Sequence, residues 1–193
     1  MQVLYLGNGD PQIINILSRY GDRVLVTDQR ISRKCQEVTH SDFLVSYGYR
    51  FILKEEVLTR FQERAINIHI SLLPWNRGAD ANLWSFLEDT PKGVTIHHLD
   101  SGIDTGKIFV QESISFDRNE TLRSSYEKLS EIAVKLLDSC WKSMRSGAVS
   151  SFSQVEGGSF HRLSDKLPYL YLLEQGWDTP VTYLTGKALP CNI

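Results

Sequence analysis

The chain has 193 residues, of which 41% are hydrophobic and 23% are charged, and its formal net charge is -2. This length suits one domain with a full core, and the near-neutral charge excludes a polyanion-binding surface. No apolar run approaches the roughly 20 residues that a membrane helix needs. The scattered cysteines, Cys35, Cys140 and Cys191, lack zinc-site spacing and suit a reducing compartment. We therefore expect a cytoplasmic protein that binds neither nucleic acid nor a membrane.

Short apolar runs alternate with helical patterns in the first part of the chain. Residues 3–6 predict a buried strand that ends in a glycine-rich turn, and Pro11 is well placed to open a helix. Short strands are also predicted at 24–26 and 43–45. The polar segment 28–41 between them has little periodicity, so we expect an abbreviated first half of the sheet.

The pattern continues with regular elements up to a long helix. This helix is predicted from Thr121 to about Ser146, where Gly147 stops it, and its apolar residues keep the spacing of a core stripe. The other predictions are helices at 54–61 and 82–87 and strands at 65–69, 93–99 and 107–115. Strands that alternate with helices predict an α/β fold with a Rossmann-like, mostly parallel sheet and helices on both faces. We expect a catalytic domain over 1–150 and a short C-terminal extension over 151–193.

Three polar residues follow these apolar runs in a pattern that favours chemistry. Asn67 and His69 lie two apart on a predicted strand, so their side chains project to the same face. An amide donor suits a carbonyl oxygen that gains negative charge, and an imidazole exchanges protons near neutral pH. If Asp104 reaches His69, it could orient the ring and favour its charged form. Such a set suffices for attack of an amine on an activated acyl carbon without a covalent enzyme intermediate.

Other interpretations of these residues are weaker. An isolated Asn67 and His69 pair would more often bond to nearby backbone, but the following turn, with two aspartates and two glycines, favours a site. The glycines of the first turn suggest a dinucleotide loop, yet Gln12 stands at the third glycine position. His97 and His98 point to opposite faces of a predicted strand, so we expect no metal site.

The combined pattern resembles the folate-dependent formyltransferases. The resemblance runs from Met1 to Gly147 and rests on Asn67-x-His69, the following Ser71–Pro74, His97, and Asp104-x-Gly106. It implies N10-formyltetrahydrofolate as the formyl donor and Asn67, His69 and Asp104 as the catalytic trio.

The resemblance also implies where folate binds. Residues 46–53 are similar to the pterin-binding loop of that family, which implies folate contacts from Tyr49, Phe51 and Leu53. The turn that contains Asp100 and Gly102 would form the opposite wall.

The acceptor is implied by a second group of motifs. Asn76–Asp80, Asn82–Trp84 and Lys92–Thr95 look like the nucleotide-linked amino-sugar N-formyltransferases, which act in surface-glycan (O-antigen) biosynthesis. The implied residues that bind the nucleotide sugar are Trp75, Arg77, Gly78, Lys92 and His97.

Two alternatives remain at this point. The acceptor could be another amine, such as glycinamide ribonucleotide, or the chain could be a folate- or nucleotide-binding relative without turnover. Methionyl-tRNA formyltransferases share the Arg-Gly pair but carry a further basic domain, for which this chain has neither the length nor the charge. Apolar residues at 169–173 are compatible with a homodimer.

Overall fold

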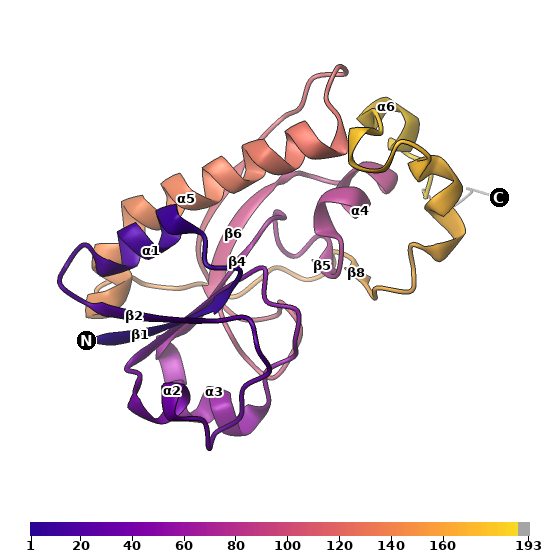
Figure 1. Ribbon diagram of the computed structural model, residues 1–193. Helices are drawn as coiled ribbons and strands as arrows, with labels where there is room; N and C mark the ends of the chain where they lie inside the picture. The colour runs from indigo at the N-terminus through magenta and orange to yellow at the C-terminus, as the bar shows by residue number, and fades with distance from the viewer. Residues whose placement is uncertain (189–193) are drawn as a thin grey trace.

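The computed structural model describes residues 1–188, and a six-stranded sheet lies at its centre (Figure 1). The strand order is β2–β1–β3–β4–β6–β7. Their bounds are β1 Gln2–Gly7, β2 Arg23–Thr27, β3 Phe43–Tyr47, β4 Ala65–His69, β6 Gly93–His98 and β7 Ile108–Ser113. The first four strands in this order run parallel, and β6 and β7 form antiparallel pairs at one side. The predicted mostly parallel α/β sheet is confirmed, with an antiparallel addition.

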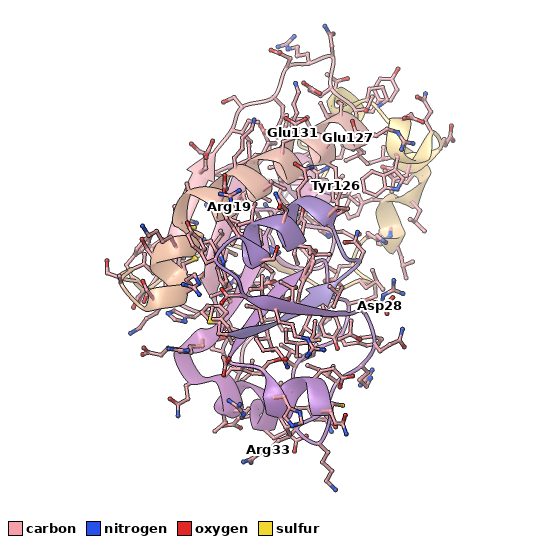
Figure 2. All side chains as sticks on the ribbon, turned by 60° about the vertical axis from the view of Figure 1, so that its left-hand side comes forward. Arg19, Asp28, Arg33, Tyr126, Glu127 and Glu131 are labelled. Carbon is pink, nitrogen blue, oxygen red and sulfur yellow. The ribbon has the colours of Figure 1, made fainter. Side chains whose placement is uncertain are left out.

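Helices cover both faces of the sheet, as predicted. Helices α1 (Pro11–Ser18) and α5 (Leu122–Ser146) pack on one face, and α2 (Gln36–His40) and α3 (Glu55–Phe61) pack on the other. A 3-10 turn (Gln62–Arg64) leads from α3 into β4. Figure 2 shows α1 beside α5, with Tyr126, Glu127 and Glu131 labelled along the longer helix.

The long helix α5 has the ends and the core stripe that its sequence predicts. Thr121 and Ser124 form a reciprocal capping box at its start, and Gly147 ends it in the left-handed conformation. Trp141 is fully buried and its ring meets Phe43 edge-on at 5.0 Å between centroids. The helix thus closes the largest of the three hydrophobic clusters among the described residues.

The first half of the sheet is abbreviated, as expected. Between β2 and β3 the chain forms the five-residue α2 after an irregular stretch. The Tyr49 hydroxyl holds this stretch, because it accepts from the Ile31 amide at 3.2 Å and donates to the Gln29 carbonyl at 2.8 Å. The Tyr49 hydroxyl therefore satisfies two backbone groups of this irregular stretch.

Two segments after residue 150 pack against a strand and a helix from the first half of the chain. Strand β8 (Phe160–His161) pairs in parallel with β5 (Arg77–Gly78), and α6 (Val181–Leu184) packs against α4 (Ala81–Leu87). Two 3-10 segments, Leu167–Leu173 and Gly176–Asp178, lie between them. The boundary near residue 150 stays a prediction, and Cys191 lies outside the described residues.

Two kinds of feature are absent from the described part of the chain. None of the helices within 1–188 combines the length and apolarity needed to cross a bilayer. The same residues hold no group of three or more His, Cys, Asp or Glu side chains placed to bind a metal ion.

Candidate functional site

Successive side chains of β4 point to opposite faces of the sheet, and each face has its own hydrophobic cluster. Ile66 and Ile68 point into the cluster beneath α5, whereas Ala65 packs in the cluster with α2 and α3. Asn67 and His69 share the face of Ala65 because side chains two apart on a strand point the same way. The turn between β6 and β7 brings Asp104 to this face.

The three polar side chains predicted to act together lie together. Asn67 Nδ2 donates to Asp104 Oδ1 at 3.1 Å, and His69 Nδ1 lies 3.7 Å from Asp104 Oδ2. The side chains of His69 and Asp104 are only 10% and 12% exposed. A carboxylate thus sits between an amide donor and an imidazole, largely shielded from solvent.

The surroundings of Asp104 keep it ionised. Burial by itself would raise the pKa of this carboxyl group. The neighbouring His69 and His97 and the Gly78 amide, which donates to Oδ2 at 2.9 Å, outweigh burial and hold the pKa of Asp104 well below its ordinary value. Asp104 is therefore a fixed negative charge at neutral pH.

A backbone carbonyl determines the tautomer of neutral His69. Nε2 lies 2.9 Å from the Asn76 carbonyl oxygen, which can only accept, so the ring proton is on Nε2. Nδ1 then carries the free lone pair, and its 3.7 Å distance from Asp104 Oδ2 is too long for a hydrogen bond. Nδ1 is the atom that can take up a proton beside a fixed negative charge.

His97 lies behind Asn67 rather than at the surface. Its ring is 1% exposed, and Nδ1 donates to the His98 carbonyl at 2.7 Å. Nε2 lies 3.3 Å from Asn67 Nδ2 and 3.4 Å from Asp104 Oδ1. That His97 contacts substrate stays a prediction, and in the structure its Nε2 faces the amide and the carboxylate of the trio.

The residues predicted to bind folate lie on two loops. The first loop (48–54) follows β3, and the second (99–107) joins β6 to β7. Phe51 stacks under the Arg30 guanidinium at 4.8 Å and meets Tyr49 edge-on at 5.4 Å. Leu53, on the same loop, and Leu99, at the start of the second loop, both pack against the cluster of α2 and α3.

The second loop is held by its own hydrogen bonds. Asp100 Oδ1 accepts from the Gly102 amide at 3.1 Å and from the Thr105 hydroxyl at 2.7 Å. Both hydrogen bonds lie within residues 100–105, so Asp100 and Gly102 belong to a turn that is closed by its own hydrogen bonds.

The residues predicted to bind the nucleotide sugar are more dispersed. Trp75 is 37% exposed, and the Arg77 guanidinium donates to the carbonyls of Gly157 at 3.3 Å and Ser159 at 3.5 Å. Gly78 contacts the trio through its amide.

Lys92 lies at the opposite end of β6 from His97. It precedes β6, whereas His97 is near the far end of that strand, so about 16 Å of chain separates them at ~3.3 Å per residue. Its ammonium group donates to the Thr90 carbonyl at 2.9 Å. The structure does not bring Lys92 to the trio.

Two residues near the trio were missed in the sequence. Asn76 is fully buried, adopts a left-handed φ of 55°, and binds His69 through its carbonyl. Gln154 donates to the backbone carbonyls of Asp104 at 2.8 Å and Gly106 at 3.0 Å. Their contacts with the site use backbone groups, which leave no side-chain motif in the sequence.

The chain is similar to solved formyltransferases over nearly all of its length. The formyltransferase PseJ from Anoxybacillus kamchatkensis, solved in complex with UDP-4,6-dideoxy-4-formamido-L-AltNAc and tetrahydrofolate, is 48% identical with a TM-score of 0.95. The match covers 97% of this chain and 100% of that chain. A sugar N-formyltransferase from Shewanella sp. is 23% identical with a TM-score of 0.75, covering 86% of this chain and 78% of that chain, and shares the fold.

Curated relatives are longer proteins. The methionyl-tRNA formyltransferase of Lachnospira eligens is 28% identical over 165 residues, which cover 78% of this chain and 52% of that relative. The chain spans about half the length of this relative, and the matches with two other methionyl-tRNA formyltransferases cover 35% and 37% of those relatives. The family model described as Formyl transferase matches residues 8–140, more than half of the chain. The chain belongs to the formyl transferase family.

Proposed function

We propose that this protein transfers a formyl group from N10-formyltetrahydrofolate to the amine of a nucleotide-linked amino-dideoxy sugar. The observation that carries the proposal is the convergence of Asn67, His69 and Asp104 in one shielded cluster. The acceptor class is supported by the 48% identity, over 97% of the chain, with a formyltransferase solved with a UDP-linked formamido sugar. On this basis the preferred acceptor is a UDP-linked 4-amino-4,6-dideoxy sugar, formylated in the cytoplasm for a surface glycan.

The proposed reaction is direct attack of the sugar amine on the formyl carbon. The new C–N bond gives a tetrahedral carbon whose oxygen is negative and whose attacking nitrogen is positive. Asn67 offers an amide N–H to that oxygen; its 3.3 Å contact with His97 Nε2 is long, and the oxyanion would replace it. The intermediate collapses by breaking the bond to N10 of the folate.

Proton movement in this reaction falls to His69 and Asp104. Nδ1 of His69 takes the proton from the attacking ammonium group, and the resulting imidazolium gains the nearby charge of Asp104. The same nitrogen can return a proton to N10 as it leaves. Atoms and charges balance, and the chain keeps no covalent intermediate.

The acceptor can be tested with a panel of amines. Purified protein and N10-formyltetrahydrofolate are incubated with UDP-4-amino-4,6-dideoxy sugars, dTDP-linked amino sugars, glycinamide ribonucleotide and methionyl-tRNA, and formylated products are measured by mass spectrometry. We expect turnover with the UDP-linked amino sugars. Turnover with glycinamide ribonucleotide or methionyl-tRNA alone would overturn the proposed acceptor.

The catalytic role of the trio can be tested at Asn67. Removal of an oxyanion donor typically lowers kcat by ~10²–10³-fold, so Asn67→Ala should lose that much activity while a folate analogue still binds. Asn119→Ala, at an exposed position, serves as the matched control with wild-type turnover. If wild type and Asn67→Ala both bind the folate analogue but neither shows turnover, the protein is a binding relative.

A further inference from the structure

Residues 152–161, which we name the crossing segment, contact both loops that surround Asp104. At its start, Phe152 and Ile108 exchange two backbone hydrogen bonds of 2.8 Å and 2.9 Å, which fix the segment to the beginning of β7. At its end, β8 pairs with β5. Gln154 lies two residues after the first anchor.

The Gln154 side chain holds the turn that carries Asp104. Its Nε2 donates to the carbonyls of Asp104 and Gly106, on either side of Thr105. Asp104 has a φ of 54°, in the left-handed region that non-glycine residues rarely adopt. A conformation of this kind persists only when surrounding contacts enforce it, and Gln154 supplies two of these contacts.

The bonding of Gln154 requires a donor at this position. Its Oε1 is buried and finds no hydrogen-bond partner among the described residues, so only Nε2 of the side-chain amide makes hydrogen bonds. A reversed amide or a carboxylate would place an oxygen against two carbonyl oxygens, which repel it. The two-carbonyl contact therefore specifies a carboxamide donor rather than a polar side chain in general.

The other end of the crossing segment holds the second partner of Asp104. The Arg77 amide donates to the Ser159 carbonyl at 3.0 Å, and the Ala79 amide donates to the His161 carbonyl at 2.9 Å. Between them, the Gly78 amide donates to Asp104 Oδ2 at 2.9 Å. One segment thus fixes both the backbone of Asp104 and the donor that its carboxylate meets.

We propose that Gln154 is a positioning residue, which sets the place of the Asp104 carboxylate against Asn67, His69 and Gly78. The contacts of Gln154 with the turn are seen in the structure, whereas its effect on turnover rests on the proposed function. Gln154 acts through the main chain of Asp104 and takes no part in the chemical step.

The test compares two glutamines that make the same kind of contact. Gln111 donates from Nε2 to the Leu73 carbonyl at 2.8 Å and to Thr95 Oγ1 at 2.9 Å, without contact with the turn. Gln154→Met and Gln111→Met each remove one such donor and keep similar volume. Thermal unfolding establishes that both variants are folded and how far each is destabilised.

The first readout needs no substrate. Exchange of the Gly78 amide proton, followed by NMR, reports its hydrogen bond to Asp104. We expect this exchange to be at least ~10-fold faster in Gln154→Met than in wild type or Gln111→Met, because local opening becomes easier. Unchanged Gly78 exchange in Gln154→Met would overturn the proposal.

The second readout is kinetic. Gln154→Met should lower kcat by ~10–100-fold with an acceptor KM within about twofold of wild type, and Gln154→Glu should lose more. A lower kcat with unchanged Gly78 exchange would mean that Gln154 touches substrate, which also contradicts the proposal. If wild type fails to formylate any sugar while Gly78 exchange responds as expected, the proposed function fails and the positioning role stands.

Discussion

The Gly78 amide and the Asp104 carboxylate are joined by a 2.9 Å hydrogen bond across 26 residues of sequence. Gly78 has a φ of 90°, and a Cβ atom there would lie 2.3 Å from the His161 carbonyl oxygen. The glycine is therefore needed both for its backbone conformation and for the close approach of β5 to β8.

Gly78→Ala should displace the loop from β8 and pull the amide from Asp104. We expect kcat to fall by ~100-fold or more, because a loop shift of about 1 Å near a site has effects of this size. Gly21→Ala is the control, since Gly21 has a φ of 78° but only open space where a Cβ atom would lie. It should lose only ~1–2 kcal/mol of stability from backbone strain and keep its turnover. Equal kinetic effects in the two variants would contradict the role of the close approach.

Asp104→Asn keeps the shape of the side chain and removes its charge. The variant can retain one accepting oxygen for Asn67 or Gly78, but the imidazolium of His69 loses its anionic neighbour. We expect kcat to fall by ~10²–10⁴-fold in steady-state assays, the range for a disabled proton-transfer pair. Binding of a folate analogue, measured by fluorescence, should change little. Loss of folate binding with a normal kcat would contradict this assignment.

A second aspartate makes stability depend on pH. Asp22 has a side chain that is 1% exposed and accepts two 2.8 Å bonds from Arg145. Burial opposes its charge, but the Arg145 guanidinium and the amino group of Met1 hold the pKa of Asp22 below its ordinary value. A depressed pKa stabilises the folded state above the unfolded-state pKa of about 3.9, and this contribution is lost as the pH falls through the folded-state pKa.

Asp22→Asn should therefore cost about 2–3 kcal/mol of unfolding free energy at pH 7, measured by urea denaturation. The difference from wild type should shrink as the pH is lowered below about 4. Asp138→Asn is the matched control, because Asp138 pairs with Arg19 at a position where both side chains are over 40% exposed. It should cost under about 1 kcal/mol. A gap between wild type and Asp22→Asn that widens in acid would contradict the pKa direction.

The buried stripe of α5 can be tested at its largest member. Trp141→Ala should lower the free energy of unfolding by about 3–5 kcal/mol, because it leaves a cavity beside Phe43. Trp177→Ala removes a tryptophan that is 52% exposed and contacts Tyr126. That control should cost about 1 kcal/mol or less. Similar losses in the two variants would mean that Trp141 does not anchor the core.

Hydrophobic periodicity predicted much of the fold because burial imposes it directly. The runs of β1 and β3 are apolar throughout because both faces are buried, and α5 is apolar along the one stripe that meets the sheet, so each element carries its own signal. The antiparallel placement of β6 and β7 was not foreseen, since strand direction depends on contacts between distant segments. The grouping of Asn67 and His69 followed from strand alternation, whereas the place of Asp104 beside them was implied by the family resemblance.

The supporting parts of the site could not be predicted in the same way. Asn76 acts through its carbonyl, Gly78 through its amide, and Gln154 through carbonyls 50 and 48 residues away. Every residue has a backbone carbonyl, and every residue except proline has a backbone N–H, so the sequence does not mark which of these groups a side chain of the site will contact. Only the path of the chain selects them.

The bond from the His69 ring to the Asn76 carbonyl limits the route that a proton can take. A carbonyl oxygen flanked by peptide bonds cannot pass a proton onward, so no relay can run through the imidazole from one nitrogen to the other. Whatever proton enters the ring at Nδ1 must leave by Nδ1. The same atom, Nδ1, must therefore take up the proton and later release it, and the group that faces Nδ1 must change between these two steps.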